Sequence, residues 1–154
     1  MKINLDLITL QSDLKTKSVD GKPCIWDPIR KKYLVLQPEE LVRQLLLNHL
    51  IKRQNYPQNF IAVEKGLDVN GLKKRFDVLV YNPNYEPFLL IECKAPSISL
   101  SEDTFRQAAQ YNSQFKAPYL LITNGPDTYC SQLDHETKSF DFLSHLPDFP
   151  HHNR

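Results

Sequence analysis

Two apolar stretches separated by a helical pattern constrain the fold of this 154-residue chain more than any other feature. Residues 88–94 predict a strand, and residues 118–123 form a nearly continuous apolar run, which is typical of a strand buried on both faces. Between them, residues 100–114 show the spacing of a helix, with a capping box predicted at Ser99 and Glu102. A strand, a helix and a strand in this order predict a right-handed crossover within one sheet.

Upstream of this unit, the pattern predicts another helix and two more strands. Pro38 opens a helix in which apolar side chains recur at i, i+3 and i+4 from Val42, and residues 55–57 should end it. Strands over 60–64 and 75–81 form a predicted hairpin. The core order is helix, three strands, helix, strand, which predicts an α/β fold with a mixed sheet flanked by helices.

We expect a single domain over residues 1–154. An N-terminal β appendage (1–36) precedes the core (37–134), and a C-terminal extension (135–154) follows. Weaker strands are predicted toward both ends of the chain, at 3–10, 24–26, 33–36, 129–133 and 140–143.

The composition argues against several classes of function. Nineteen basic and eighteen acidic residues give a net charge of +1, which argues against a protein that coats nucleic acid with an entirely basic surface. Three widely spaced cysteines without a CxxC pair favour neither a zinc knuckle nor a disulfide framework. The sequence has no GxxxxGK(S/T) loop, no apolar run long enough to span a bilayer and no signal peptide, so we expect a cytoplasmic protein without membrane contact.

The most informative stretch is the end of the strand at 88–94, where Glu92 and Lys94 are two residues apart. Because side chains alternate along a strand, Glu92 and Lys94 face one side and Cys93 faces the other. Asp77 interrupts the apolar strand before it, and pairing of the two strands would bring Asp77 close to Glu92 on the same face. The alternative is a surface Glu–Lys pair with Asp77 exposed to solvent.

Two carboxylates that converge on a sheet repel each other unless a positive group joins them. Mg²⁺ is a natural solution, since it commonly uses one or two carboxylates together with water and substrate phosphate. We therefore expect Asp77 and Glu92 to bind Mg²⁺, for which Mn²⁺ should substitute. Lys94 would orient the attacking water or help to deprotonate it.

The first helix offers a further acid. Its phase places Glu39 on the inward face with Val42, whereas Glu40 groups with Arg43 and Gln44, so Glu39 is the better candidate for a third carboxylate. Stabilisation of the helix dipole explains a first-turn glutamate equally well.

The later helix offers two polar side chains on one face. Gln107 and Tyr111 are four residues apart, so both can reach a phosphate or support Lys94. An exposed polar stripe is the competing explanation.

In this element order, Asp77, Glu92-x-Lys94 and Gln107-xxx-Tyr111 resemble the PD-(D/E)xK nuclease superfamily. More narrowly, the chain resembles the nuclease domain at the N-terminus of type I restriction endonuclease R subunits, over about residues 25–133. Phe76 stands where the family motif nominally has proline.

The resemblance implies a restriction-endonuclease-like fold and Mg²⁺-dependent hydrolysis of DNA. It implies metal ligation by Asp77, Glu92 and the backbone carbonyl of Cys93. It further implies a catalytic lysine, an auxiliary acid and two residues that contact DNA ends and phosphates, namely Lys94, Glu39, Gln107 and Tyr111.

Substrate contact would also come from a local basic strip, Lys73-Lys74-Arg75, and from Arg106. A solvated strand edge explains Lys73, Lys74 and Arg75 equally well.

Two other functions stay open from the sequence. One is a non-catalytic module that binds nucleic acid or protein and keeps the nuclease fold, and the other is an unrelated α/β domain. Because the chain has no Walker motif, we expect that ATP-driven restriction would need a separate motor or specificity subunit. DNA is the expected partner, and a homodimer is left open.

Overall fold

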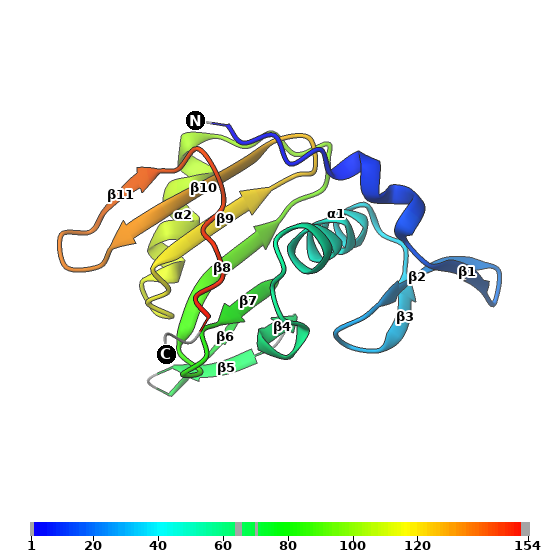
Figure 1. The fold of residues 1–154 in the computed structure, drawn as a ribbon, viewed down its shortest axis with the longest axis horizontal. Coiled ribbons are helices and arrows are strands. Elements are labelled where there is room, and N and C mark those ends of the chain that lie inside the picture. Colours follow the sequence, from blue (N-terminus) through cyan, green and yellow to red (C-terminus); the bar gives the residue numbers. More distant parts are fainter. Residues whose placement is uncertain (1, 64–65, 70, 152–154) are drawn as a thin grey trace.

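A six-stranded mixed sheet forms the centre of the computed structural model, which describes residues 2–63, 66–69 and 71–151 (Figure 1). The strand order is β11-β10-β9-β8-β7-β4. Along the chain, these strands are β4 (Ile61–Val63), β7 (Val78–Tyr81), β8 (Pro87–Cys93), β9 (Tyr119–Thr123), β10 (Thr128–Asp134) and β11 (Ser139–Phe142). β8 and β9 run parallel, and the other neighbouring pairs run antiparallel, so the predicted mixed sheet is confirmed.

The predicted crossover is confirmed in the middle of this sheet. β8 leads into α2 (Glu102–Asn112), and β9 then returns parallel to β8. Phe105 and Ala108 of α2 pack with Leu90 and Leu120 in one hydrophobic cluster. Burial of this apolar surface holds α2 against its face of the sheet.

The other face of the sheet is covered by α1 (Pro38–Asn48), so the two α-helices lie on opposite sides (Figure 1). Pro38 lies in the first turn, as predicted. The helix continues as a π-helical turn (His49–Arg53), and Asn55 follows with a left-handed φ of 58°. α1 is held by apolar side chains that pack with those of β7 and β8 in a second hydrophobic cluster, among them Leu46, Leu47, Leu50, Val78, Leu89 and Ile91.

A separate three-stranded antiparallel sheet lies at the end of the molecule next to α1 (Figure 1). We call it the N-terminal sheet. It consists of β1 (Thr16–Val19), β2 (Lys22–Asp27) and β3 (Lys32–Val35). The expected β structure at 24–26 and 33–36 is confirmed.

Three local predictions were wrong. The strand expected at 3–10 is a 3-10 helix (Leu7–Asp13), because Asp6 has a left-handed φ of 55° and its N–H donates to the Asn4 side chain. The strand expected at 75–81 is shorter, since a small hairpin of β5 (Gly66–Val69) and β6 (Leu72–Arg75) precedes β7.

The third wrong prediction concerns the start of α2. Its capping box is formed by Ser101 and Thr104, not by Ser99 and Glu102. The backbone N–H of Thr104 donates to Ser101 Oγ at 3.2 Å, and the backbone N–H of Ser101 donates to Thr104 Oγ1 at 3.3 Å. A threonine hydroxyl thus accepts the return hydrogen bond that was expected at the carboxylate of Glu102.

α1 and α2 have 11 residues each. A helix needs roughly 20 apolar residues to span a bilayer. No helix in the described ranges is therefore long and apolar enough to cross a membrane.

Candidate functional site

Glu92 and Lys94 lie at the carboxyl end of β8, at the centre of the main sheet. Leu90 belongs to the cluster beneath α2, and side chains alternate along a strand, so Glu92 projects on the α2 side. Cys93 packs in the opposite cluster and is buried, as predicted. Lys94 Nζ lies 3.7 Å from Glu92 Oε2, and both side chains are partly exposed (38% and 27%), so a solute can reach them.

Asp77 lies beside this pair, at the position predicted from the pairing of the two strands. Val78 pairs with Ile91 in the antiparallel register of β7 and β8, so the next position brings Asp77 opposite Glu92. Asp77 Oδ2 accepts a hydrogen bond of 2.8 Å from the backbone N–H of Cys93. The structure therefore brings Asp77, Glu92 and Lys94 together at one point.

The charges around Glu92 act on its protonation. Burial raises the pKa of Glu92 above its ordinary value. The Lys94 ammonium acts against this rise in pKa, whereas the negative charges of Asp77 and Glu39 add to it. Three carboxylates thus lie near enough to repel one another. Any further positive charge at the site would reduce this repulsion.

The predicted phase of α1 was wrong in part. Glu39 is exposed rather than inward, although its charge still acts on Glu92. Glu40 groups with Arg43 and Gln44 as expected, but these two residues are on a buried side of the helix. One reason is that Arg30, in the segment that follows β2, reaches Glu40 and covers a polar part of α1 that would otherwise face solvent.

Sequence analysis missed a series of partly or fully buried ion pairs that ends at Asp77. Arg43 Nη2 lies 3.6 Å from Asp77 Oδ1, and Arg43 Nη1 donates to Glu40 Oε1 at 3.0 Å. Arg30 Nη2 donates to the same Glu40 oxygen at 3.1 Å, and Arg30 Nε donates to Asp27 at 2.7 Å. Acidic and basic side chains alternate along this series of ion pairs, which connects the N-terminal sheet to the candidate site.

Asp27, at the buried end of this series of ion pairs, is fixed by several hydrogen bonds. Asp27 is fully buried and also accepts the backbone N–H groups of Ile29 and Arg30. Burial alone would raise the pKa of Asp27, but these hydrogen bonds and the Arg30 guanidinium outweigh it and hold the pKa below its ordinary value. The i,i+3 spacings of Asp27 with Arg30 and of Glu40 with Arg43 were the sequence signals for these ion pairs, and such a spacing is equally common among exposed residues.

The residues predicted on α2 differ in their surroundings. Tyr111 is half-buried and packs against Phe115, with ring centroids 5.5 Å apart. Gln107 is exposed one turn earlier. Arg106 is exposed too, and its guanidinium pairs with Glu102 at 2.9 Å and with Asp103 at 3.9 Å on its own helix. Arg106 is therefore partly neutralised, which weakens its case as a phosphate contact.

The predicted basic strip lies on β6. The backbone of Lys73, Lys74 and Arg75 pairs with β5, but their side chains lie outside the described part of the structure. Their role as DNA contacts stays a prediction.

The residues at the site fit a hard divalent cation with few protein ligands. In the described part of the chain, no group of three or more His, Cys, Asp or Glu side chains is placed to hold a metal alone. Asp77 and Glu92 nevertheless converge at cross-strand positions, and the backbone at Cys93 lies between them. Two carboxylates completed by a carbonyl, water and phosphate are the ligands that Mg²⁺ prefers.

Comparison with known proteins places this geometry in context. Residues 38–147 match the family model of the type I restriction enzyme R protein N terminus (HSDR_N). The comparison with curated proteins gives no match. The chain is also similar to a fragment ascribed to an HsdR subunit of a type I restriction enzyme from Vibrio vulnificus YJ016, with a TM-score of 0.51 and 18% identity. That match covers 73% of this chain and 24% of the other, so at this identity it shows a shared fold over about a quarter of the longer protein.

Proposed function

Because the chain belongs to the family of type I restriction enzyme R protein N termini, we propose that it is a metal-dependent nuclease domain that hydrolyses DNA phosphodiester bonds. In this proposal, its mixed sheet is of the restriction-endonuclease type. The observation that carries it is the convergence of Asp77, Glu92 and Lys94 at the end of β8, with Glu39 near enough to act on Glu92.

Asp77 and Glu92 would hold Mg²⁺ or Mn²⁺, with the Cys93 carbonyl as a third ligand. When bound, the ion supplies Lewis acidity at the phosphate and a water of lowered pKa. The N–H of Cys93 fixes the Asp77 carboxylate through its hydrogen bond, and Arg43 holds the same carboxylate from the side of α1. These contacts fix the Asp77 carboxylate before any ion arrives, which would reduce the cost of ordering the site.

Lys94 would act on the attacking water and on the charge that develops at phosphorus. Its ammonium is partly exposed and lies within an ion-pair distance of Glu92, so it is held at the site within reach of a solute. Glu39 would serve as an auxiliary acid on the solvent side. Gln107 and Tyr111 would contact the phosphate backbone from the α2 side, the side on which Glu92 projects.

We further propose that the domain works in the cytoplasm with other components of a restriction system. DNA is the substrate, and motor and specificity functions would come from other subunits or from parts of a longer protein. A homodimer is compatible with this proposal.

The purified chain should cleave DNA when Mg²⁺ or Mn²⁺ is present and should stop when EDTA removes the metal. Linear, circular and single-stranded DNA, resolved on gels, would separate attack at ends from attack within the strand. If none of the three substrates is cut with either metal, the nuclease proposal fails and a non-catalytic binding module is favoured.

A further inference from the structure

The basic residues of this chain are concentrated in and beside the N-terminal sheet. Residues 14–36 contain six basic and two acidic residues, a net charge of +4, whereas the whole chain carries +1. The remainder of the chain is therefore acidic overall. Such a separation of charge marks a surface that attracts polyanions.

The lysines of this region are not neutralised by their surroundings. Asp27 is buried and engaged by Arg30, which leaves Asp20 as the only exposed acid between residues 14 and 36. Five exposed lysines remain, namely Lys15, Lys17, Lys22, Lys31 and Lys32. Among the described residues, none of these five has a carboxylate within 4.0 Å, in contrast to Lys2, Lys52 and Lys94.

Three of these lysines share one face of the sheet with two aromatic rings. Trp26 pairs with Tyr33 across β2 and β3, and their ring centroids are 5.1 Å apart. Lys17 Nζ lies 4.1 Å from the centroid of the Tyr33 ring, which places Lys17 on the same face. Lys15 precedes β1, and its backbone carbonyl accepts a hydrogen bond from the N–H of Trp26. Lys22 lies four residues before Trp26 on β2, so the alternation of side chains places both on the same face of the sheet. We call this surface the lysine face.

The lysine face continues into a hollow at the base of the N-terminal sheet. Its volume is about 240 Å³, and Trp26 and Lys15 are among its lining residues. Lys52 also lines it, together with the uncharged polar residues Asn48 and Gln58. One acid, Asp13, also borders the hollow, but Asp13 is paired with Lys52 at 3.6 Å.

We propose that the lysine face binds the sugar–phosphate backbone of DNA. Ammonium groups on Lys15, Lys17 and Lys22 would neutralise phosphates, which is the main source of affinity in sequence-independent binding. Trp26 and Tyr33 offer the flat, partly exposed rings on which bases stack when DNA is single-stranded. The choice of DNA over another polyanion rests on the proposed nuclease function.

This surface adds to the DNA interface expected from the sequence. Arg106 is tied to its own helix, whereas the lysine face is free of carboxylate partners in the described structure. The ion-pair chain from Asp27 to Asp77 gives the N-terminal sheet a fixed connection to the candidate site. DNA held on the lysine face would therefore be held by an element anchored to the proposed catalytic residues.

The test uses the whole chain in EDTA, so that binding is measured without cleavage. The anisotropy of a labelled duplex and of a labelled single strand is titrated over a series of salt concentrations. The triple variant Lys15→Gln, Lys17→Gln, Lys22→Gln should bind about tenfold or more weakly, and the slope of log K against log salt should fall by about 2–3 on duplex DNA.

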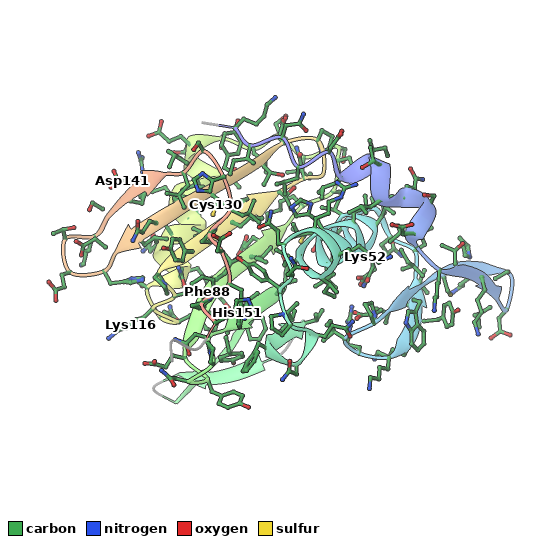
Figure 2. All side chains as sticks on the ribbon, viewed as in Figure 1. Lys52, Phe88, Lys116, Cys130, Asp141 and His151 are labelled. Atoms are coloured by element: carbon green, nitrogen blue, oxygen red, sulfur yellow. The ribbon has the colours of Figure 1, made fainter. Side chains whose placement is uncertain are left out.

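The matched control is Lys116→Gln with Lys138→Gln. Lys116 and Lys138 are also exposed and near each other, and Lys116 lies at the far end of the main sheet from Lys52 (Figure 2). The control should keep the parent affinity and salt slope. If the triple variant binds DNA as tightly as the parent, the lysine face does not bind DNA and the proposal is overturned, whether or not the control weakens binding.

The unmodified protein provides a second readout. Trp26 is the only tryptophan of the chain, so its fluorescence reports on the lysine face alone. Adding DNA in EDTA should change this fluorescence along the same binding curve as the anisotropy. Binding without any change in Trp26 emission would contradict the proposal. A chain that binds DNA here but never cleaves it would disprove the nuclease function and leave the lysine face standing.

Discussion

Lys94→Ala is expected to reduce metal-dependent DNA cleavage by about a hundredfold or more, while the metal still binds. The ammonium of Lys94 lies 3.7 Å from Glu92 and is the described cation nearest to that carboxylate. Removing it takes away a group that would assist proton transfer, an effect that commonly amounts to about 10²–10⁴-fold in rate. Asp77 and Glu92 remain, so the proposed ligands are kept. Single-turnover cleavage rates and metal-induced thermal shifts, both at mildly alkaline pH, measure the two effects separately.

Lys116→Ala is the matched control for this variant, since it removes an exposed lysine away from the carboxyl end of β8. It should cleave at the parent rate. Cleavage by Lys94→Ala within a factor of about three of the parent would remove Lys94 from the mechanism.

Arg43→Met is expected to be the most destabilising single substitution near the site. The guanidinium of Arg43 is almost fully buried and lies between Glu40 and Asp77. Removing one partner of a buried ion pair costs about 3–5 kcal/mol, because the remaining charge stays desolvated. Arg30 still pairs with Glu40, and Asp77 is one-quarter exposed, so we expect about 3 kcal/mol. Urea unfolding followed by circular dichroism measures this free energy.

Arg106→Met is the control, because Arg106 makes comparable ion pairs on an exposed helix. Such pairs contribute roughly 0.3–0.5 kcal/mol. The double variant Arg43→Met, Asp77→Asn should recover part of the lost stability, since it also removes the charge of the carboxylate that faced Arg43. Equal losses in Arg43→Met and Arg106→Met would show that the buried chain of ion pairs does not stabilise the fold.

Much of the main sheet was predictable because its signals are local. The apolar runs at 88–94 and 118–123 and the helix between them define the crossover without knowledge of other contacts. Alternation along β8 places Glu92 and Lys94 on one face, and the short connection from β7 fixes the position of Asp77. These three residues lie close together because of strand geometry alone.

The features that the sequence did not predict depend mostly on packing between segments that are distant in the sequence. Asp77 contacts Arg43 across 34 positions of sequence, and the helical phase of α1 gives no sign that a second layer covers its polar side. Glu39 was therefore assigned inward, whereas the covered acid is Glu40. In the N-terminal segment, a side-chain hydrogen bond at Asn4 and the left-handed Asp6 outweigh an alternating pattern that is too short to specify a strand.

From the sequence, repulsion between Asp77 and Glu92 predicts that metal-free Asp77→Asn is as stable as the parent or slightly more stable, but the cations in the structure reverse this expectation. Repulsion between Asp77 and Glu92 is reduced in this structure, since Arg43 lies beside one carboxylate and Lys94 beside the other. Asp77→Asn removes the charge that faces Arg43. The metal-free variant should therefore be less stable than the parent by about 1 kcal/mol.

The most direct measurement is the thermal melt of the parent and of Asp77→Asn with and without Mg²⁺ or Mn²⁺. A ligand that prefers the native state stabilises it by RT ln(1 + [L]/Kd), which is about 1.4 kcal/mol at ten times Kd. For a chain of this size, the parent Tm should rise by about 3–5 °C. Asp103→Asn, which changes an exposed carboxylate on α2, should keep this shift, and Asp77→Asn should lose most of it. An equal shift in the parent and in Asp77→Asn would mean that Asp77 is not a metal ligand and would contradict the proposed nuclease site.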